Sequence, residues 1–195
     1  MSEEISRRFF CRVAWALPLF LVAQRQAVAQ TTLSCSSDKE TPEETEGPYF
    51  KPSSPERRSL LEPGIEGRRL VLSGLVMTPS CVRVSRAMLD FWHADANGEY
   101  DNSGFRLRGH QFTDDQGRYR LETIVPGHYP GRTRHIHVKV QAHGAPILTS
   151  QLYFPGEVRN RSDWLFRRDL LVTVIDASET MRARFDFIVA ATTDS

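Results

Sequence analysis

Short runs in which apolar and polar residues alternate recur along the chain, and most of them end at a turn signal built from Pro, Gly, Asn or Asp. The runs are Arg69–Met77, Ala87–His93, Phe105–Thr113, Arg118–Val125, His135–Ala142, Leu148–Phe154, Leu170–Ile175 and Arg182–Ala190. Even spacing of short strands with a period of two is typical of a sandwich or a barrel. We predict one all-β domain over residues 68–195, an antiparallel β-sandwich of about eight strands. Little helix is expected, with one short piece near Glu157–Arg168.

The residues ahead of this domain predict a targeting segment and an arm. Residues 1–29 resemble a cleaved export signal, with an apolar stretch at Val13–Ala23 and a cleavage site at Ala27-Val28-Ala29. Ser6-Arg7-Arg8-Phe9-Phe10 resembles a twin-arginine motif, which predicts export to the periplasm or the cell exterior. An N-terminal membrane anchor is the alternative. Residues 30–67, rich in Ser, Thr, Glu, Pro and Gly, predict an extended arm with turns.

Composition and charge narrow the classes of function. The 195 residues are 40% hydrophobic and 25% charged, a globular balance that excludes a collagen-like or disordered chain. The formal net charge is +1, so no strong basic field is present to attract nucleic acid. We therefore expect no nucleic-acid partner and, once the signal has been removed, no membrane contact.

Two cysteines, Cys35 and Cys81, remain after removal of the signal, which contains Cys11. In an oxidising compartment these two could form one disulfide that ties the arm to the domain. Two unpaired thiols are the alternative, because a disulfide requires a short distance that the sequence does not encode.

The candidate chemistry lies with two histidines and two tyrosines. His135-Ile136-His137 falls in a predicted strand, where residues i and i+2 face the same side, so both imidazoles can chelate one metal ion. Ile136 then faces the core. Tyr100 and Tyr129 lie close to turns and away from any alternating core face. Taken singly, these features are also compatible with a surface histidine pair and with half-buried tyrosines bonded to water or backbone.

Five longer stretches place these residues in a larger pattern. They are Thr45–Phe50 (TEGPYF), Asp90–Tyr100 (DFWHADANGEY), Thr123–Pro130 (TIVPGHYP), Arg132–His137 (RTRHIH) and Leu148–Gly156 (LTSQLYFPG). In this order they resemble the intradiol ring-cleavage dioxygenases of catechols, over most of the chain between Thr41 and Glu157. The signal segment would place the protein in an exported branch of that family.

The resemblance implies an enzyme that takes a small aromatic diol and O2 as substrates. It would insert O2 between the two hydroxyl-bearing carbons of a catechol and give a muconate-type diacid. The implied ligands of a non-haem iron(III) are Tyr100, Tyr129, His135 and His137. Tyr129, Arg132 and Gln151 match catalytic positions of the family, and Arg132, Gln151 and Pro48 match positions that bind substrate.

The types of donor atom agree with iron(III) as the cofactor. Iron(III) is a hard cation, and two anionic phenolate oxygens stabilise it relative to the ferrous state. A tyrosine free in water has a pKa near ~10, so a bound cation must hold both phenolates. Zinc is the main alternative metal, and it seldom takes two tyrosinates.

One departure from the family pattern concerns the substrate. The stretch between Tyr129 and His135 is shorter than in the protocatechuate-cleaving members, so substrate preference is not carried over. A homo-oligomer is compatible with the sequence.

A non-catalytic β-sandwich binding module, transthyretin-like or carbohydrate-associated, would make the histidines and tyrosines incidental. Another metal-dependent oxidase or lyase would use the same four ligands for different chemistry.

Overall fold

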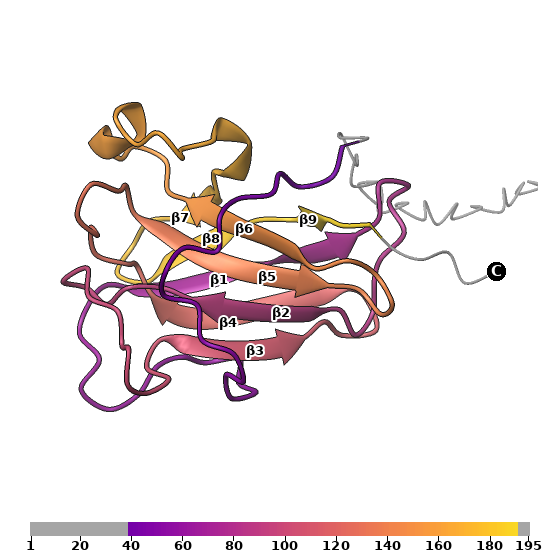
Figure 1. Ribbon diagram of the computed structural model, residues 1–195, viewed down its shortest axis with the longest axis horizontal. Helices are drawn as coiled ribbons and strands as arrows, with labels where there is room; N and C mark the ends of the chain where they lie inside the picture. Colours follow the sequence, from indigo (N-terminus) through magenta and orange to yellow (C-terminus); the bar gives the residue numbers. More distant parts are fainter. Residues whose placement is uncertain (1–38, 191–195) are drawn as a thin grey trace, which may run out of the picture. The chain divides into compact units, whose positions relative to one another are not determined.

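A computed structural model describes residues 39–190, which form two β-sheets (Figure 1). The strands are β1 (Arg69–Met77), β2 (Met88–Trp92), β3 (Arg108–Phe112), β4 (Arg118–Ile124), β5 (His135–Gln141), β6 (Leu148–Tyr153), β7 (Thr173–Asp176), β8 (Met181–Arg184) and β9 (Phe187–Ile188). The 3₁₀ helices η1 (Val158–Arg161) and η2 (Arg168–Leu170) lie between β6 and β7. One sheet has the order β4-β1-β8-β7, with β9 also paired to β1, and the other has the order β3-β2-β5-β6. The predicted all-β sandwich is confirmed.

Most strand pairs are antiparallel as predicted. The two exceptions are the pairs that β1 forms with β8 and with β9, which are parallel. The last predicted run, Arg182–Ala190, is split between these two strands. At the split, the side chain of Asp186 accepts a hydrogen bond from the backbone N–H of Leu75 at 2.9 Å. A side chain therefore takes the place of a backbone partner, and the ladder is interrupted.

The segment predicted as a short helix, Glu157–Arg168, contains the single turn η1 and an irregular loop, and its last residue begins η2. Side chains in this segment bond to backbone groups and compete with a regular helix. Asn160 Nδ2 donates to the carbonyl oxygen of Phe154 at 2.8 Å, and the carboxylate of Asp163 accepts from the N–H of Leu165 at 3.0 Å. This loop is consequently a fixed structure in which Asp163 is buried.

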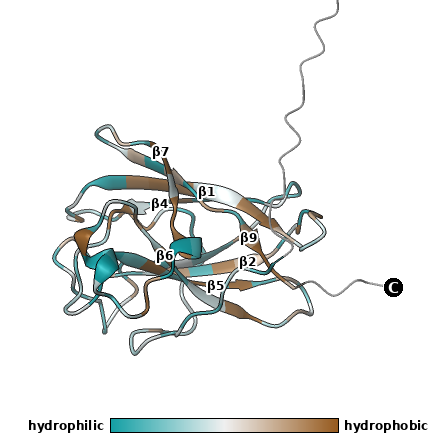
Figure 2. Cartoon of the chain, turned by 90° about the horizontal axis from the view of Figure 1, so that it is seen from above, coloured by the Kyte–Doolittle hydropathy of each residue, from teal (hydrophilic) through white to brown (hydrophobic). Residues whose placement is uncertain are grey.

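Strand β5 shows how the alternation separates the core from the candidate site. Ile136, Val138 and Val140 are fully buried and belong to the apolar core between the sheets, as predicted for Ile136. Figure 2 shows the two layers, with β1, β4 and β7 in one and β2, β5 and β6 in the other. His135 and His137 alternate with the core residues, so they point away from the core on the other face of their sheet.

The described part of the arm, residues 39–67, packs along both sheets. Backbone N–H groups of Thr41, Glu44 and Leu60 donate to carbonyl oxygens of β9, β6 and β4, at 2.8, 2.9 and 2.8 Å. Leu60 is fully buried in the core. In Figure 1 the indigo arm crosses the sheet that contains β5 and β6. This path brings residues 45–50 toward the face that carries the two histidines.

Several predictions concern residues outside the described range. The export signal, its cleavage site and Cys35 all lie there. Cys81 is disulfide-bonded, and its pairing with Cys35 stays a prediction. Within residues 39–190, none of the helices is both long and apolar enough to cross a bilayer.

Candidate metal centre

The imidazole rings of His135 and His137 converge on the outer face of β5. Their Nε2 atoms are 3.2 Å apart. His135 Nδ1 donates to the carbonyl oxygen of Thr133 at 2.7 Å, so its Nε2 keeps a free lone pair. The ring of His137 stacks on Trp92, its cross-strand neighbour in β2, with ring centroids 4.9 Å apart. Two nitrogens about 2.1 Å from one metal and at a right angle would be about 3 Å apart, so this spacing suits a shared cation.

Burial keeps both imidazoles neutral. Loss of hydration lowers the pKa of His135 to about 4 and the pKa of His137 well below its ordinary value. Between neutral rings, the Nε2–Nε2 contact either contains one N–H or brings two lone pairs together. In either arrangement the buried Nδ1 atom of His137 has no hydrogen-bond partner among the described residues. The second arrangement is repulsive unless a cation lies between the nitrogens, so the pair fits a metal.

Tyr100, close to the turn that follows β2, brings an oxygen donor to the histidines. Its hydroxyl oxygen is 3.4 Å from Nε2 of His135. Burial raises the pKa of Tyr100, and the positive charges of Arg132 and Arg108 oppose that rise. Among residues 39–190, no group of three or more His, Cys, Asp or Glu side chains could hold a metal. The hydroxyl of Tyr100 is a donor of another type within reach of this histidine pair.

The turns beside Tyr100 and Tyr129 pack directly against each other. Gly127 donates its N–H to a carbonyl oxygen of the turn after β2 at 2.7 Å. A Cβ on Gly127 would lie 2.4 Å from backbone of that turn, and a Cβ on Gly98 would lie 2.1 Å from a carbonyl oxygen of the turn after β4. Only glycine permits this approach, and Gly98 also has a φ of +88°. The rings of Tyr100 and Tyr129 are thereby held 6.0 Å apart and nearly perpendicular.

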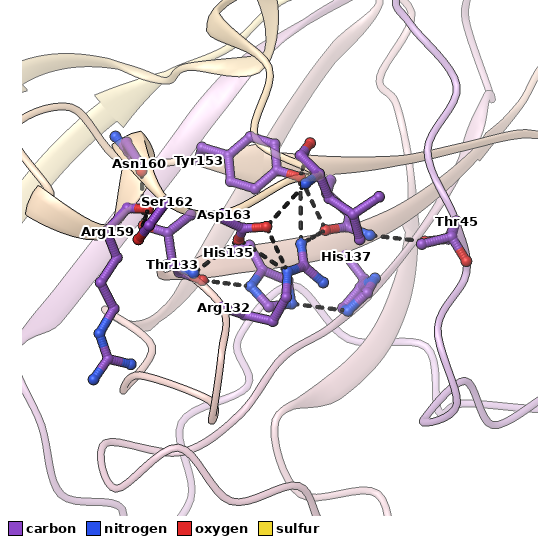
Figure 3. A network of polar contacts seen from close by, with 12 residues as sticks. Thr45, Arg132, Thr133, His135, His137, Tyr153, Arg159, Asn160, Ser162 and Asp163 are labelled. Atoms are coloured by element: carbon purple, nitrogen blue, oxygen red, sulfur yellow. Dashed lines mark hydrogen bonds and ion pairs between the residues drawn. The ribbon is translucent and has the colours of Figure 1, made fainter.

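Arg132 is at the centre of a polar network beside the histidines (Figure 3). Its Nε contacts both carboxylate oxygens of Asp163, at 3.0 and 2.9 Å. One Nη donates to the side-chain oxygen of Gln151 at 2.7 Å. Gln151 is fully buried in β6 and pairs in register with His137. The structure thus places Arg132 and Gln151 next to the two histidines.

Asp163 links this network to the orientation of His135. Besides Arg132, its carboxylate accepts from the N–H of Thr133 at 2.8 Å, and the side chain is only 1% exposed. The carbonyl oxygen of Thr133 is the group that holds Nδ1 of His135. One buried carboxylate therefore positions both the guanidinium and the residue that orients a candidate ligand.

A family model described as a dioxygenase matches residues 45–190, a range that contains every candidate site residue. A catechol 1,2-dioxygenase of Acinetobacter guillouiae is 27% identical, with 74% of this chain and 57% of that protein covered. A protocatechuate 3,4-dioxygenase beta chain of Burkholderia cepacia is 30% identical, with 63% of this chain and 65% of that protein covered. The chain belongs to the intradiol ring-cleavage dioxygenase family.

A solved structure of a dioxygenase domain is also similar to this chain. It is the dioxygenase domain of a dioxygenase carbohydrate-binding protein fusion from the cellulolytic bacterium Streptomyces sp. SirexAA-E. That domain is 52% identical with a TM-score of 0.76, and the match covers 79% of this chain and 100% of that one. By contrast, this chain spans less than two thirds of either curated relative, 57% and 65%.

Two residues of this dioxygenase site were not among the sequence predictions. Tyr49 lies in the Thr45–Phe50 motif beside Pro48, and its hydroxyl is 3.0 Å from the hydroxyl of Tyr129. Pro48 is exposed, and its role in lining a pocket stays a prediction. Asp163 follows η1 in the irregular loop, 31 residues from Arg132, and no local pattern marks it. Motif position could have indicated Tyr49, whereas only the fold reveals Asp163.

Proposed function

We propose that the protein is a non-haem iron(III) dioxygenase that opens the ring of a catechol between its hydroxyl-bearing carbons, with O2 as co-substrate and a muconate-type diacid as product. The observation that carries this proposal is the convergence of two neutral, buried imidazoles, 3.2 Å apart, with the Tyr100 hydroxyl 3.4 Å from one of them. Membership of the intradiol family supports the reaction type.

In this proposal the metal is held by Tyr100, Tyr129, His135 and His137. When bound, iron(III) favours deprotonated oxygen ligands and withdraws electron density from a catechol that binds to it. Tyr129, deprotonated while it is a ligand, would take up one of the two catechol protons on its phenolate oxygen, as the family resemblance implies. The burial of both histidines excludes water from their side of the site.

Arg132 and Gln151 have different roles in the proposal. Arg132 supplies a fixed positive charge that stabilises negative charge as it develops on the substrate. The amide of Gln151 is engaged on both sides, since its oxygen accepts from Arg132 at 2.7 Å and its nitrogen donates to the carbonyl oxygen of Thr45 at 2.8 Å. We therefore assign Gln151 a positioning role through Arg132, in addition to the catalytic and substrate-binding position that the family resemblance implies.

Protein loaded with iron(III) is expected to be red-brown and to consume O2 with a catechol, because phenolate-to-iron charge transfer absorbs visible light. The measurements are a visible spectrum, oxygen uptake with catechol, protocatechuate and hydroxyquinol, and mass spectrometry of the product. Zinc-loaded protein is the matched control and should be colourless and inactive. A colourless iron-loaded protein would favour the non-catalytic binding module. Ring opening beside the hydroxyls would refute the intradiol reaction.

We also propose that the protein is exported by the twin-arginine route. The support for this part is the sequence Ser6-Arg7-Arg8-Phe9-Phe10 within residues 1–29. Replacing Arg7 and Arg8 together by lysine should leave the protein in the cytoplasmic fraction, whereas the parent chain should reach the periplasm or medium. Equal export of both chains, measured by immunoblot of the cell fractions, would contradict this route.

A further inference from the structure

Glu157 lies just beyond β6, and its carboxylate contacts two side chains from an earlier part of the chain. One carboxylate oxygen accepts a hydrogen bond from Nε2 of His128 at 2.9 Å. The other oxygen lies 3.1 Å from Nε of Arg134, as an ion pair and not as an aligned hydrogen bond. The three side chains are between 24% and 32% exposed, so water reaches them only in part. One partly buried carboxylate thus joins His128 to Arg134.

The two residues that Glu157 joins are the immediate neighbours of two candidate ligands. His128 directly precedes Tyr129, and Arg134 directly precedes His135. The turn between the two ligands is exposed at Gly131, where a Cβ would meet no described residue within 4 Å beyond its chain neighbours. Packing at the tip of this turn therefore does not fix Tyr129 relative to His135.

Arg134 makes a second contact between the same two stretches of chain. One Nη donates to the carbonyl oxygen of Pro126 at 3.0 Å. Pro126 lies at the start of the turn that carries Tyr129. The negative charge of Glu157 attracts the guanidinium and holds it where this bond can form. The carboxylate thus acts on the Tyr129 turn from both sides, directly through one partner and indirectly through the other.

We propose that Glu157 is a positioning residue that fixes Tyr129 relative to His135. It acts through His128 and Arg134, the two side chains that its oxygens contact. This inference rests on the proposed function, in which Tyr129 and His135 are metal ligands. Loss of a residue that orients ligands costs about 10–100-fold in metal affinity. Glu157 should therefore slow the loss of metal from the site.

The test is Glu157→Ala, studied first without metal and then with iron(III). In the metal-free variant, hydrogen–deuterium exchange should be faster than in the parent over residues 128–135 and unchanged in β1. In the iron-loaded variant, transfer of iron to excess EDTA should be about tenfold faster, measured as the decay of the visible band. Glu157→Gln keeps the shape and loses the charge, so its rate should lie between those of the parent and Glu157→Ala.

Variants of the two partners show whether Glu157 acts through them. His128→Ala and Arg134→Ala each remove one contact of the carboxylate, so each should give part of the increase in the rate of iron release. Adding Glu157→Ala to the variant that lacks both partners should change the rate less than about twofold, because members of one network are not additive. A further tenfold increase in this triple variant would contradict the proposed route. If Glu157→Ala does not fold, Glu157→Gln and the partner variants make the same comparison.

The matched control is Glu122→Ala. Glu122 pairs with Arg120 at 2.8 Å, and both residues belong to β4, so this ion pair joins no separate segments. The control should leave the rate of iron release unchanged, and exchange over residues 128–135 should also match the parent. An equal effect of Glu122→Ala would show that any lost surface ion pair loosens the domain, which would overturn the inference.

The other outcomes separate this inference from the proposed function. A coloured parent whose Glu157→Ala variant releases iron at the parent rate would refute the inference alone. Faster release without faster exchange over residues 128–135, or faster exchange throughout the domain, would also refute a local positioning role. A parent protein that is colourless after iron loading would refute the proposed function and this inference with it.

Discussion

The His137→Ala variant is expected to lose its bound iron, its visible colour and its ring-cleaving activity together. The two imidazoles act as one chelating pair whose Nε2 atoms are 3.2 Å apart, and a single imidazole cannot provide two nitrogen ligands to one metal ion. Loss of a group that merely orients a ligand costs about 10–100-fold in metal affinity, so loss of a ligand should cost at least about 100-fold. Iron content by atomic spectroscopy and the visible spectrum measure the effect directly.

The control for His137→Ala is His143→Ala. His143 is an exposed residue of the turn between β5 and β6, beyond the end of the strand that carries His137. This variant should keep its iron and its colour. Circular dichroism of both variants checks that the sandwich is intact. Full retention of iron in His137→Ala would refute the assignment of this residue as a ligand.

Asp163→Asn is expected to lower both stability and turnover, because the Asp163 carboxylate is buried and forms several bonds at once. Its side chain is 1% exposed and that of its partner Arg132 is 13% exposed. Removing the negative charge leaves a poorly hydrated guanidinium without its counter-ion, which should cost about 2–4 kcal/mol of unfolding free energy. Since Asp163 also binds the N–H of Thr133, the orientation of His135 is disturbed as well. We expect kcat to fall at least about tenfold.

Asp169→Asn is the matched control in the same connection between β6 and β7. Asp169 pairs with Arg167 at 3.5 Å, and the two side chains are 67% and 46% exposed. An ion pair of this kind contributes less than about 1 kcal/mol, so its loss should leave stability and kcat nearly unchanged. Denaturant unfolding and steady-state kinetics on both variants make the comparison. Equal effects of the two substitutions would contradict the positioning role of Asp163.

The strand pattern was largely predictable because each strand imposes a local period of two. Arg69–Met77 was predicted with its observed bounds, and the other strands begin and end within a few residues of the predicted runs. Prediction failed where side chains replace backbone partners. Asp186 interrupts the last run by bonding to Leu75, and bonds from the side chains of Asn160 and Asp163 take the place of a regular helix.

Local sequence pattern is enough to assign the side chains of β5 to its two faces. His135 and His137 had to project together and Ile136 had to enter the core, because alternation is a property of any extended strand. The turn glycines Gly98 and Gly127 were likewise present in the quoted motifs. Residues close together in sequence could therefore be placed by local geometry.

The way in which distant segments meet at these histidines follows from the folded arrangement of the chain and from no local pattern. Tyr49 reaches Tyr129 across 80 positions of sequence, and Asp163 reaches Arg132 across 31. Such contacts depend on how the arm and an irregular loop pack over the sheet, and no period along the chain encodes that packing. Alternation fixes the directions of the side chains within one strand. The hydrogen bonds between loops form only after the sandwich has brought those loops together.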